Sequence, residues 1–193
     1  IGPGILLKVQ AGDELELWCR SWWQGTMSGQ SNTDQSSVQN AVAGILGNML
    51  PAISGGKINI GQTGTNGSWF APGILSFLQA QNPTPTDRPK AFVNWMFMND
   101  QFEYTANNGS GSESVSTAND YKLHERNKAN SNTIKAKQSG YVYIYTSNES
   151  SLSVYFDNLK VNHIRGPLME ETHYYPFGLV MAGISSKAAN RLD

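Results

Sequence analysis

The chain has 193 residues, with 14 Lys and Arg against 15 Asp and Glu, so its formal net charge is −1. That length suits one domain with a full core, or at most two small domains. A near-neutral chain lacks the basic field that nucleic-acid binding uses, which argues against a nucleic-acid partner. No continuous apolar run reaches the roughly 18 residues of a membrane-spanning helix, so the sequence predicts no membrane insertion.

Small uncharged residues supply most of the polarity. Only 15% of residues are charged, beside 20 Ser, 18 Asn and 19 Gly. This balance is typical of extracellular bacterial β domains and predicts a secreted or cell-surface location. Cys19 has no second cysteine to pair with, and its place in an alternating strand indicates packing rather than reactivity. Because the chain begins at Ile1 and ends at Asp193 without a natural stopping motif, we expect it to belong to a longer protein.

Residues 4–23 predict two strands around a turn at residues 11–13. Leu15, Leu17 and Cys19 alternate with polar and aromatic residues, as in a half-buried antiparallel strand. Residues 24–36 are polar and predict a loop. Apolar residues at helical spacing follow over 38–49 and again over 74–78. Residues 24–88 are therefore interpreted as a long insertion that carries one or two short helices.

Strand patterns resume at residue 90, whereas residues 107–131, rich in Asn, Ser and Gly, predict a mobile loop. Val93, Trp95 and Phe97 alternate with Phe92, Asn94, Met96 and Met98, and further strands are predicted over 133–136, 141–145 and 152–161. Tyr141, Tyr143 and Tyr145 share one strand face, for which we expect solvent exposure. A change of alternation between Phe156 and Leu159 predicts a bulge near residues 157–158. The fold class is all-β: an antiparallel, jelly-roll-like β-sandwich over residues 1–165, followed by a tail or adapter over 166–193.

The tail carries a recognisable motif. Residues 171–179 read Glu-Thr-His-Tyr-Tyr-Pro-Phe-Gly-Leu, and residues 181–188 read Met-Ala-Gly-Ile-Ser-Ser-Lys-Ala. This segment resembles the one that precedes the core of bacterial RHS/YD-repeat proteins, and residues 2–9, 89–95 and 140–145 resemble the domain upstream of it. The resemblance implies a module of a large secreted or surface protein that contacts the adjoining RHS-repeat region.

A second similarity concerns the last predicted strand. Residues 154–161 read Val-Tyr-Phe-Asp-Asn-Leu-Lys-Val, which is similar to the last strand of galactose-binding-like jelly-roll carbohydrate-binding modules. In such modules an acidic residue of this strand often helps to hold a structural calcium, and Asp157 is the position that matches. The alternative is that Asp157 caps the bulge.

Sugar binding needs flat apolar faces for stacking and polar groups that bind hydroxyls. Trp22, Trp23 and Trp69 are candidate stacking platforms, because two of them end a strand and the third lies in the insertion. Gln24 and Asn66 beside them are candidate hydroxyl-binding residues. Since large aromatics dominate protein cores, each tryptophan could instead be buried; for Trp95, in an apolar strand, we expect the core.

These observations predict a non-catalytic module that binds a polysaccharide or cell-surface glycan, with no required cofactor apart from the calcium that Asp157 would hold. A structural spacer or docking module of the RHS shell is the first alternative. A glycoside hydrolase or esterase on a β-sandwich is the second, for which the sequence shows no GxSxG motif and no carboxylate pair in one local motif. The sequence favours a protein that is not an enzyme.

Overall fold

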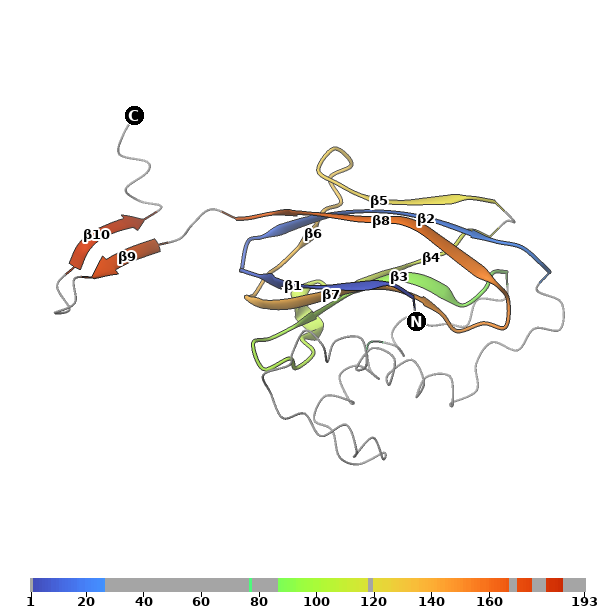
Figure 1. The fold of residues 1–193 in the computed structure, drawn as a ribbon, viewed down its shortest axis with the longest axis horizontal. Helices are drawn as coiled ribbons and strands as arrows, with labels where there is room; N and C mark the ends of the chain where they lie inside the picture. The colour runs from blue at the N-terminus through green and yellow to red at the C-terminus, as the bar shows by residue number, and fades with distance from the viewer. Residues whose placement is uncertain are drawn as a thin grey trace, which may run out of the picture.

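The computed structural model describes residues 2–26, 77, 87–117, 120–166, 170–174 and 180–185. Within them eight strands form a sandwich of two antiparallel sheets that face each other, as Figure 1 shows. The first sheet has the strand order β1–β7–β3–β4. In the second, β2 pairs with β5 and β6 along one edge and with β8 along the other. The prediction of an all-β antiparallel sandwich is confirmed.

The sandwich strands are β1 (Gly4–Val9), β2 (Glu14–Trp23), β3 (Ala91–Met98), β4 (Gly111–Ser114), β5 (Lys122–Arg126), β6 (Ile134–Lys135), β7 (Gly140–Asn148) and β8 (Val154–Ile164). A short 3-10 helix, η3 (Ala106–Asn108), follows β3. The chain passes from one sheet to the other between β1 and β2, between β2 and β3, between β4 and β5, and on either side of β7. Most of the connections between consecutive sandwich strands therefore cross between the two sheets.

The core lies between the sheets and follows from their two-residue alternation. It is formed by Val9, Leu15, Leu17, Cys19, Val93, Trp95, Phe97, Ile134, Ala136, Val142 and Ile144. Trp95 is buried as expected. Burial raises the pKa of the Cys19 thiol to about 11, so it stays protonated and packs as an apolar side chain.

The central strands of the first sheet, β3 and β7, are buried on both faces over most of their length. Every residue of β3 is buried, including Met96 and Met98 on the face turned away from the core. The expectation that the Tyr141–Tyr145 face is solvated is wrong: Tyr143 and Tyr145 are buried and their rings stack 4.9 Å apart. Phe77, the described residue of the predicted insertion that is helical, is also buried and packs on Tyr104. The helices predicted for residues 24–88 otherwise lie outside the described residues.

A bulge interrupts β8 where the sequence predicts one. The register of β8 against β2 shifts between Trp18, which faces Lys160, and Arg20, which faces Asp157. Asn158 takes a left-handed backbone conformation with φ 55°, which asparagine tolerates better than most residues. As a result, Asp157 and Lys160 both point away from the core although three positions separate them.

The chain leaves the sandwich at Gly166, which is hydrogen-bonded to Asp13. We call the contacts that Asp13 makes with Gln10, His163 and Gly166 the latch. The buried Asp13 carboxylate accepts hydrogen bonds from the Gln10 and Gly166 backbone N–H groups at 2.9 and 2.7 Å, and it lies 2.7 Å from His163 Nε2. A Cβ atom at Gly166 would lie 2.8 Å from the Gly12 carbonyl carbon, so the close approach requires glycine. Beyond it, β9 (Glu170–Tyr174) and β10 (Val180–Ser185) pair as a hairpin that lies apart from the sandwich in Figure 1.

Asp13→Asn should weaken the sandwich and change its response to acid. Burial raises the pKa of Asp13, but the hydrogen bonds from Gln10, Gly166 and His163 outweigh it and hold the pKa below its usual value. The stabilisation is therefore present above the unfolded pKa of about 4 and is lost as the pH falls through the lower folded pKa. We expect the variant to lose about 1–3 kcal/mol of unfolding free energy at pH 7.

Urea unfolding between pH 7 and pH 2 measures this effect. Asp13→Asn should show a shallower decline in stability below about pH 4 than the parent protein does. Asp100→Asn, at an exposed turn position, is the matched control and should follow the parent protein. Identical profiles for Asp13→Asn and the parent protein would show that the latch does not stabilise the fold.

Candidate functional site

The outer face of the second sheet carries the exposed aromatic side chains of the sandwich. Since Leu15, Leu17 and Cys19 of β2 point into the core, the alternating Trp18, Arg20 and Trp22 point outward. Strand β5 lies along one edge of β2 and β8 along the other, and both add outward side chains to the same face. The side chains of three strands thus form rows across this sheet.

One row is aromatic. Trp22 lies opposite Tyr155 of β8, with ring centroids 5.3 Å apart and planes inclined by 27°. On its other side Tyr121, which precedes β5, lies 6.0 Å away at 21°. Tyr121 is 71% exposed, Tyr155 is 57% exposed and Trp22 is half-buried. These three residues, called the aromatic row below, form a nearly continuous surface of offset, roughly parallel rings.

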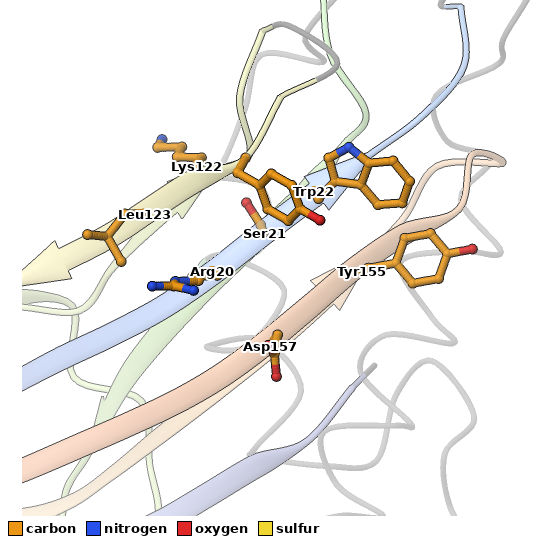
Figure 2. A pocket seen from close by; sticks show the side chains of 8 residues that line it. Arg20, Ser21, Trp22, Lys122, Leu123, Tyr155 and Asp157 are labelled. Carbon is orange, nitrogen blue, oxygen red and sulfur yellow. The ribbon is translucent and has the colours of Figure 1, made fainter.

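A mixed row lies beside it, two residues further down β2. Arg20 stands between Leu123 of β5 and Asp157 of β8, its partners in the strand registers. The two rows line a shallow groove of about 500 Å³ on the sheet surface. In Figure 2 the Arg20 guanidinium turns away from Asp157, while the rings of Trp22 and Tyr155 lie side by side at one end of the groove.

Trp18 lies in a third row, where the neighbouring side chains of Glu125 and Lys160 contact its indole ring. Its indole N–H donates to the Glu125 carboxylate at 3.2 Å, and the Lys160 ammonium lies 5.0 Å from the ring centroid. This ammonium covers one face of the indole in a cation–π contact. Trp18 is thus held by the protein itself, whereas Tyr121 and Tyr155 of the aromatic row are exposed.

The described residues that were predicted to bind a ligand do not all lie on one surface. Trp22 belongs to the aromatic row, and Gln24, directly after β2, is exposed. Trp23 is 3% exposed and packs with Ala91 and Val115, so the expectation that it offers a stacking face is wrong. The reason is strand geometry, since neighbouring residues of β2 point to opposite faces. Asn66 and Trp69 lie outside the described residues.

Sequence reasoning missed Tyr121, Tyr155 and Arg20 as site residues. For two of them, strand alternation predicts a side chain on the outer face of the sheet. Arg20 follows the core residue Cys19, and Tyr155 lies between the apolar residues Val154 and Phe156. Tyr121 stands at the end of a polar segment, and its place depends on the pairing of Lys122 with Ser21, which no local pattern indicates.

Asp157, the predicted calcium ligand, has a different set of partners. Its two carboxylate oxygens accept hydrogen bonds from the backbone N–H and the side-chain amide of Asn158, each at 2.8 Å. Among the described residues, no three His, Cys, Asp or Glu side chains gather in the manner of a metal site. Calcium takes six to eight oxygen ligands. The observed contacts fit the alternative that Asp157 caps the bulge, and the calcium site stays a prediction.

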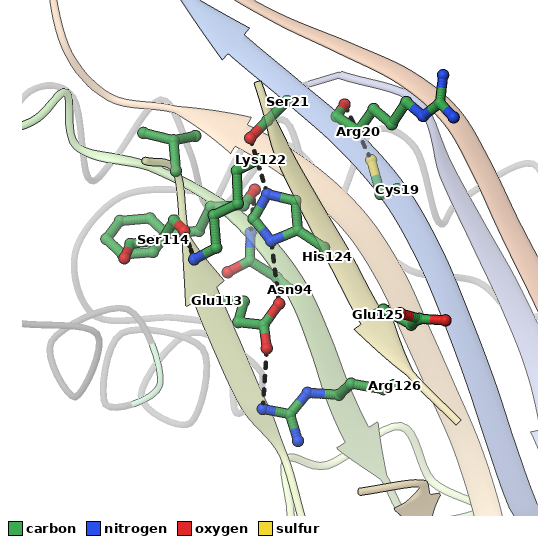
Figure 3. A network of polar contacts seen from close by, with 12 residues as sticks. Cys19, Arg20, Ser21, Asn94, Glu113, Ser114, Lys122, His124, Glu125 and Arg126 are labelled. Carbon is green, nitrogen blue, oxygen red and sulfur yellow. Dashed lines mark hydrogen bonds and ion pairs between the residues drawn. The ribbon is translucent and has the colours of Figure 1, made fainter. Parts of the chain in front are cut away.

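A second polar cluster lies between the two sheets, as Figure 3 shows. Ser21 Oγ lies 2.8 Å from His124 Nε2, and His124 Nδ1 lies 3.0 Å from a Glu113 carboxylate oxygen. The other oxygen of Glu113 forms an ion pair with Arg126 at 3.3 Å. Because an ionised carboxylate can only accept, the contact with Glu113 requires that His124 donates a hydrogen bond from Nδ1. We call these four residues the polar seam.

The polar seam places a serine, a histidine and a carboxylate in the order found in serine hydrolases, but its serine hydroxyl is not open to a substrate as theirs is. Ser21 is 2% exposed and His124 is fully buried, so a substrate cannot reach the hydroxyl. The hydrogen bond from His124 lowers the pKa of Glu113 despite its burial, which keeps this carboxylate ionised. The seam joins β4 of the first sheet to β2 and β5 of the second, which are not paired with β4. Its geometry supports a structural role.

Comparisons with protein-family models, with curated proteins and with solved structures found no match. Within the described part of the chain, no helix has the length and apolar character needed to cross a membrane.

His124→Ala should destabilise the protein strongly, because it leaves the buried Ser21 hydroxyl and the half-buried Glu113 carboxylate without their central partner. We expect a loss of about 2–3 kcal/mol, measured by chemical unfolding. Leu123→Ala, the neighbour of His124 that points outward, is the control and should cost much less. If the seam were catalytic instead, the parent protein would hydrolyse a p-nitrophenyl ester faster than Ser21→Ala does; we expect no difference.

Proposed function

We propose that this module binds a glycan, and that the aromatic row of Tyr121, Trp22 and Tyr155 is its stacking surface. The observation that carries the proposal is the arrangement of three roughly parallel rings on one sheet face, of which Tyr121 and Tyr155 are exposed and Trp22 is half-buried. Sugar rings present flat C–H faces, which stack on aromatic rings, and hydroxyls around their rims, which need polar partners. Arg20 and Asp157 supply such partners beside the rings.

The form of the groove favours a chain over a compact ligand. It is shallow and lies open along the sheet surface, whereas pockets for drug-sized molecules bury most of their ligand. The spacing of neighbouring rings, 5.3 and 6.0 Å, is close to the length that one sugar residue occupies in a glycan chain. A polysaccharide or cell-surface glycan could therefore lie across the strands with successive residues on successive rings.

The setting of the module is part of the same proposal. The resemblance of residues 171–188 to the segment before RHS/YD-repeat cores supports a secreted or cell-surface protein of bacteria, in which the module precedes the repeat region. Hairpin β9–β10, formed by this segment, would connect the two. The glycan-binding face belongs to β2, β5 and β8 and does not use the hairpin strands.

A docking role toward the RHS shell is the second candidate. It is favoured by the hairpin, which lies apart from the sandwich in Figure 1 and pairs only β9 with β10 among the described strands. The latch at Asp13 and Gly166 would then set the direction in which the hairpin leaves the sandwich. Catalysis receives less support, because the Ser–His–Glu set of the described residues is buried.

Affinity electrophoresis against soluble and insoluble glycans tests the proposed function. We expect retardation on at least one glycan, and we expect Trp22→Ala and Tyr155→Ala each to weaken binding at least tenfold, a loss of about 1.4 kcal/mol. Isothermal titration calorimetry with the retarded glycan would give the dissociation constants.

Tyr141→Ala is the matched control, because it removes a tyrosine ring from the other sheet. It should leave glycan affinity unchanged, and circular dichroism should show that all variants are folded. Absence of binding to every glycan, together with binding of the adjoining RHS region, would favour the docking role instead.

A further inference from the structure

We infer that the glycan is acidic and that Arg20 binds a carboxylate of a uronic acid residue stacked on the aromatic row. This inference rests on the proposed function and specifies its ligand. It follows from three features of the groove: the guanidinium of Arg20, which has no acidic partner among the described residues, the hydrogen bonds that neutral donors make to the nearby carboxylates, and the position of Arg20 beside Trp22.

Arg20 is exposed at the centre of the groove and has no acidic partner there. It faces Asp157 in the strand register, where a cross-strand ion pair would be expected. Yet no carboxylate of the described residues lies within 4.0 Å of its guanidinium, the distance that defines a salt bridge. Figure 2 shows the reason, since the Arg20 side chain extends toward β5 and away from Asp157.

The carboxylates of this sheet face are engaged elsewhere. Asp157 is held by both nitrogen donors of Asn158. Glu125 accepts from the Trp18 indole and, at 2.7 Å, from the Asn127 side-chain amide. In each case neutral groups nearby supply the hydrogen bonds, so the acids are fixed in place without drawing in Arg20.

Glu16, further along β2, follows the same pattern. It accepts hydrogen bonds from the Lys128 backbone N–H at 3.0 Å and from the Asn162 side-chain amide at 2.8 Å. Lys122, which also lines the groove, directs its ammonium to the Ser114 carbonyl oxygen. Arg20 is therefore the cation of the groove that is left to bind an incoming anion.

Guanidinium chemistry indicates which anion fits. Arginine presents a rigid planar fork that binds a carboxylate through two parallel hydrogen bonds. Positions two residues apart on one strand face lie about 7 Å apart, so Arg20 is one side-chain length from the Trp22 ring. A sugar ring stacked on Trp22 can thus extend a carboxylate on its rim toward Arg20.

The test compares matched acidic and neutral forms of the same polymers. Polygalacturonate, alginate and a polyglucuronate would be used beside the same chains after reduction of their carboxyl groups to primary alcohols. We expect at least one polyuronate to bind tenfold or more tightly than its reduced form. Arg20→Gln should remove this preference while retaining binding to the reduced chain, and Arg20→Lys should restore only part of it. The preference should decrease as salt increases.

Lys137→Gln is the matched control, because it removes one exposed positive charge at a turn outside the groove. It should keep the full preference. Equal binding of acidic and reduced chains, unchanged by Arg20→Gln, would overturn the inference and leave the proposed function standing. Binding of dextran sulfate as tight as that of the polyuronates would overturn the assignment of a carboxylate. Failure of every acidic and neutral chain to bind would contradict the inference and the proposed function together.

Discussion

Strand β2 is hydrogen-bonded along both edges, to β5 and to β8, so its side chains can only divide between two faces. The inward set supplies Leu15, Leu17 and Cys19 to the core, and Ser21 to the polar seam. The outward set supplies Trp22 and the neighbouring Arg20 to the groove. Core, seam and groove therefore share one strand. A one-residue slip of β2 would exchange the two sets, which would bury Arg20 and expose the apolar residues.

The polar seam constrains the sheets in a way that the apolar core does not. Apolar contacts tolerate small sliding, whereas the contacts of His124 with Ser21 and Glu113 require fixed positions of three strands from two sheets. The net stabilisation by such buried hydrogen bonds is modest, but loss of one partner is costly, since the others stay buried. The buried ion pair of Lys90 and Glu149, at 2.9 Å, similarly ties the approach to β3 to the end of β7.

The sequence predicts those parts of the molecule that depend on local alternation. It indicates β1, β2, β3, β6, β7 and β8, the burial of Trp95 and the bulge at residues 157–158, because each leaves a two-residue pattern or a break in one. The loop predicted for residues 107–131 is wrong, since β4 and β5 lie there in a segment whose many Ser and Asn residues hide the alternation. The sequence does not predict that Tyr143 and Tyr145 are buried, since strand periodicity cannot tell whether the outer face of a sheet is covered. Nor does it assemble the aromatic row or the polar seam: both depend on which strands pair, and residues about a hundred positions apart, such as Ser21 and His124, meet only in the folded chain.

The bulge at Asn158 connects the fold to the proposed specificity. By adding one residue to β8 it changes the alternation, so that Tyr155 and Asp157 on one side of it and Lys160 on the other all face outward. The same residue supplies both donors that hold the Asp157 carboxylate. A regular strand would remove those donors from Asp157 and leave its carboxylate facing Arg20 across the strands, where the two would neutralise each other. The backbone irregularity thus keeps the arginine available beside the aromatic row, which an acidic glycan requires.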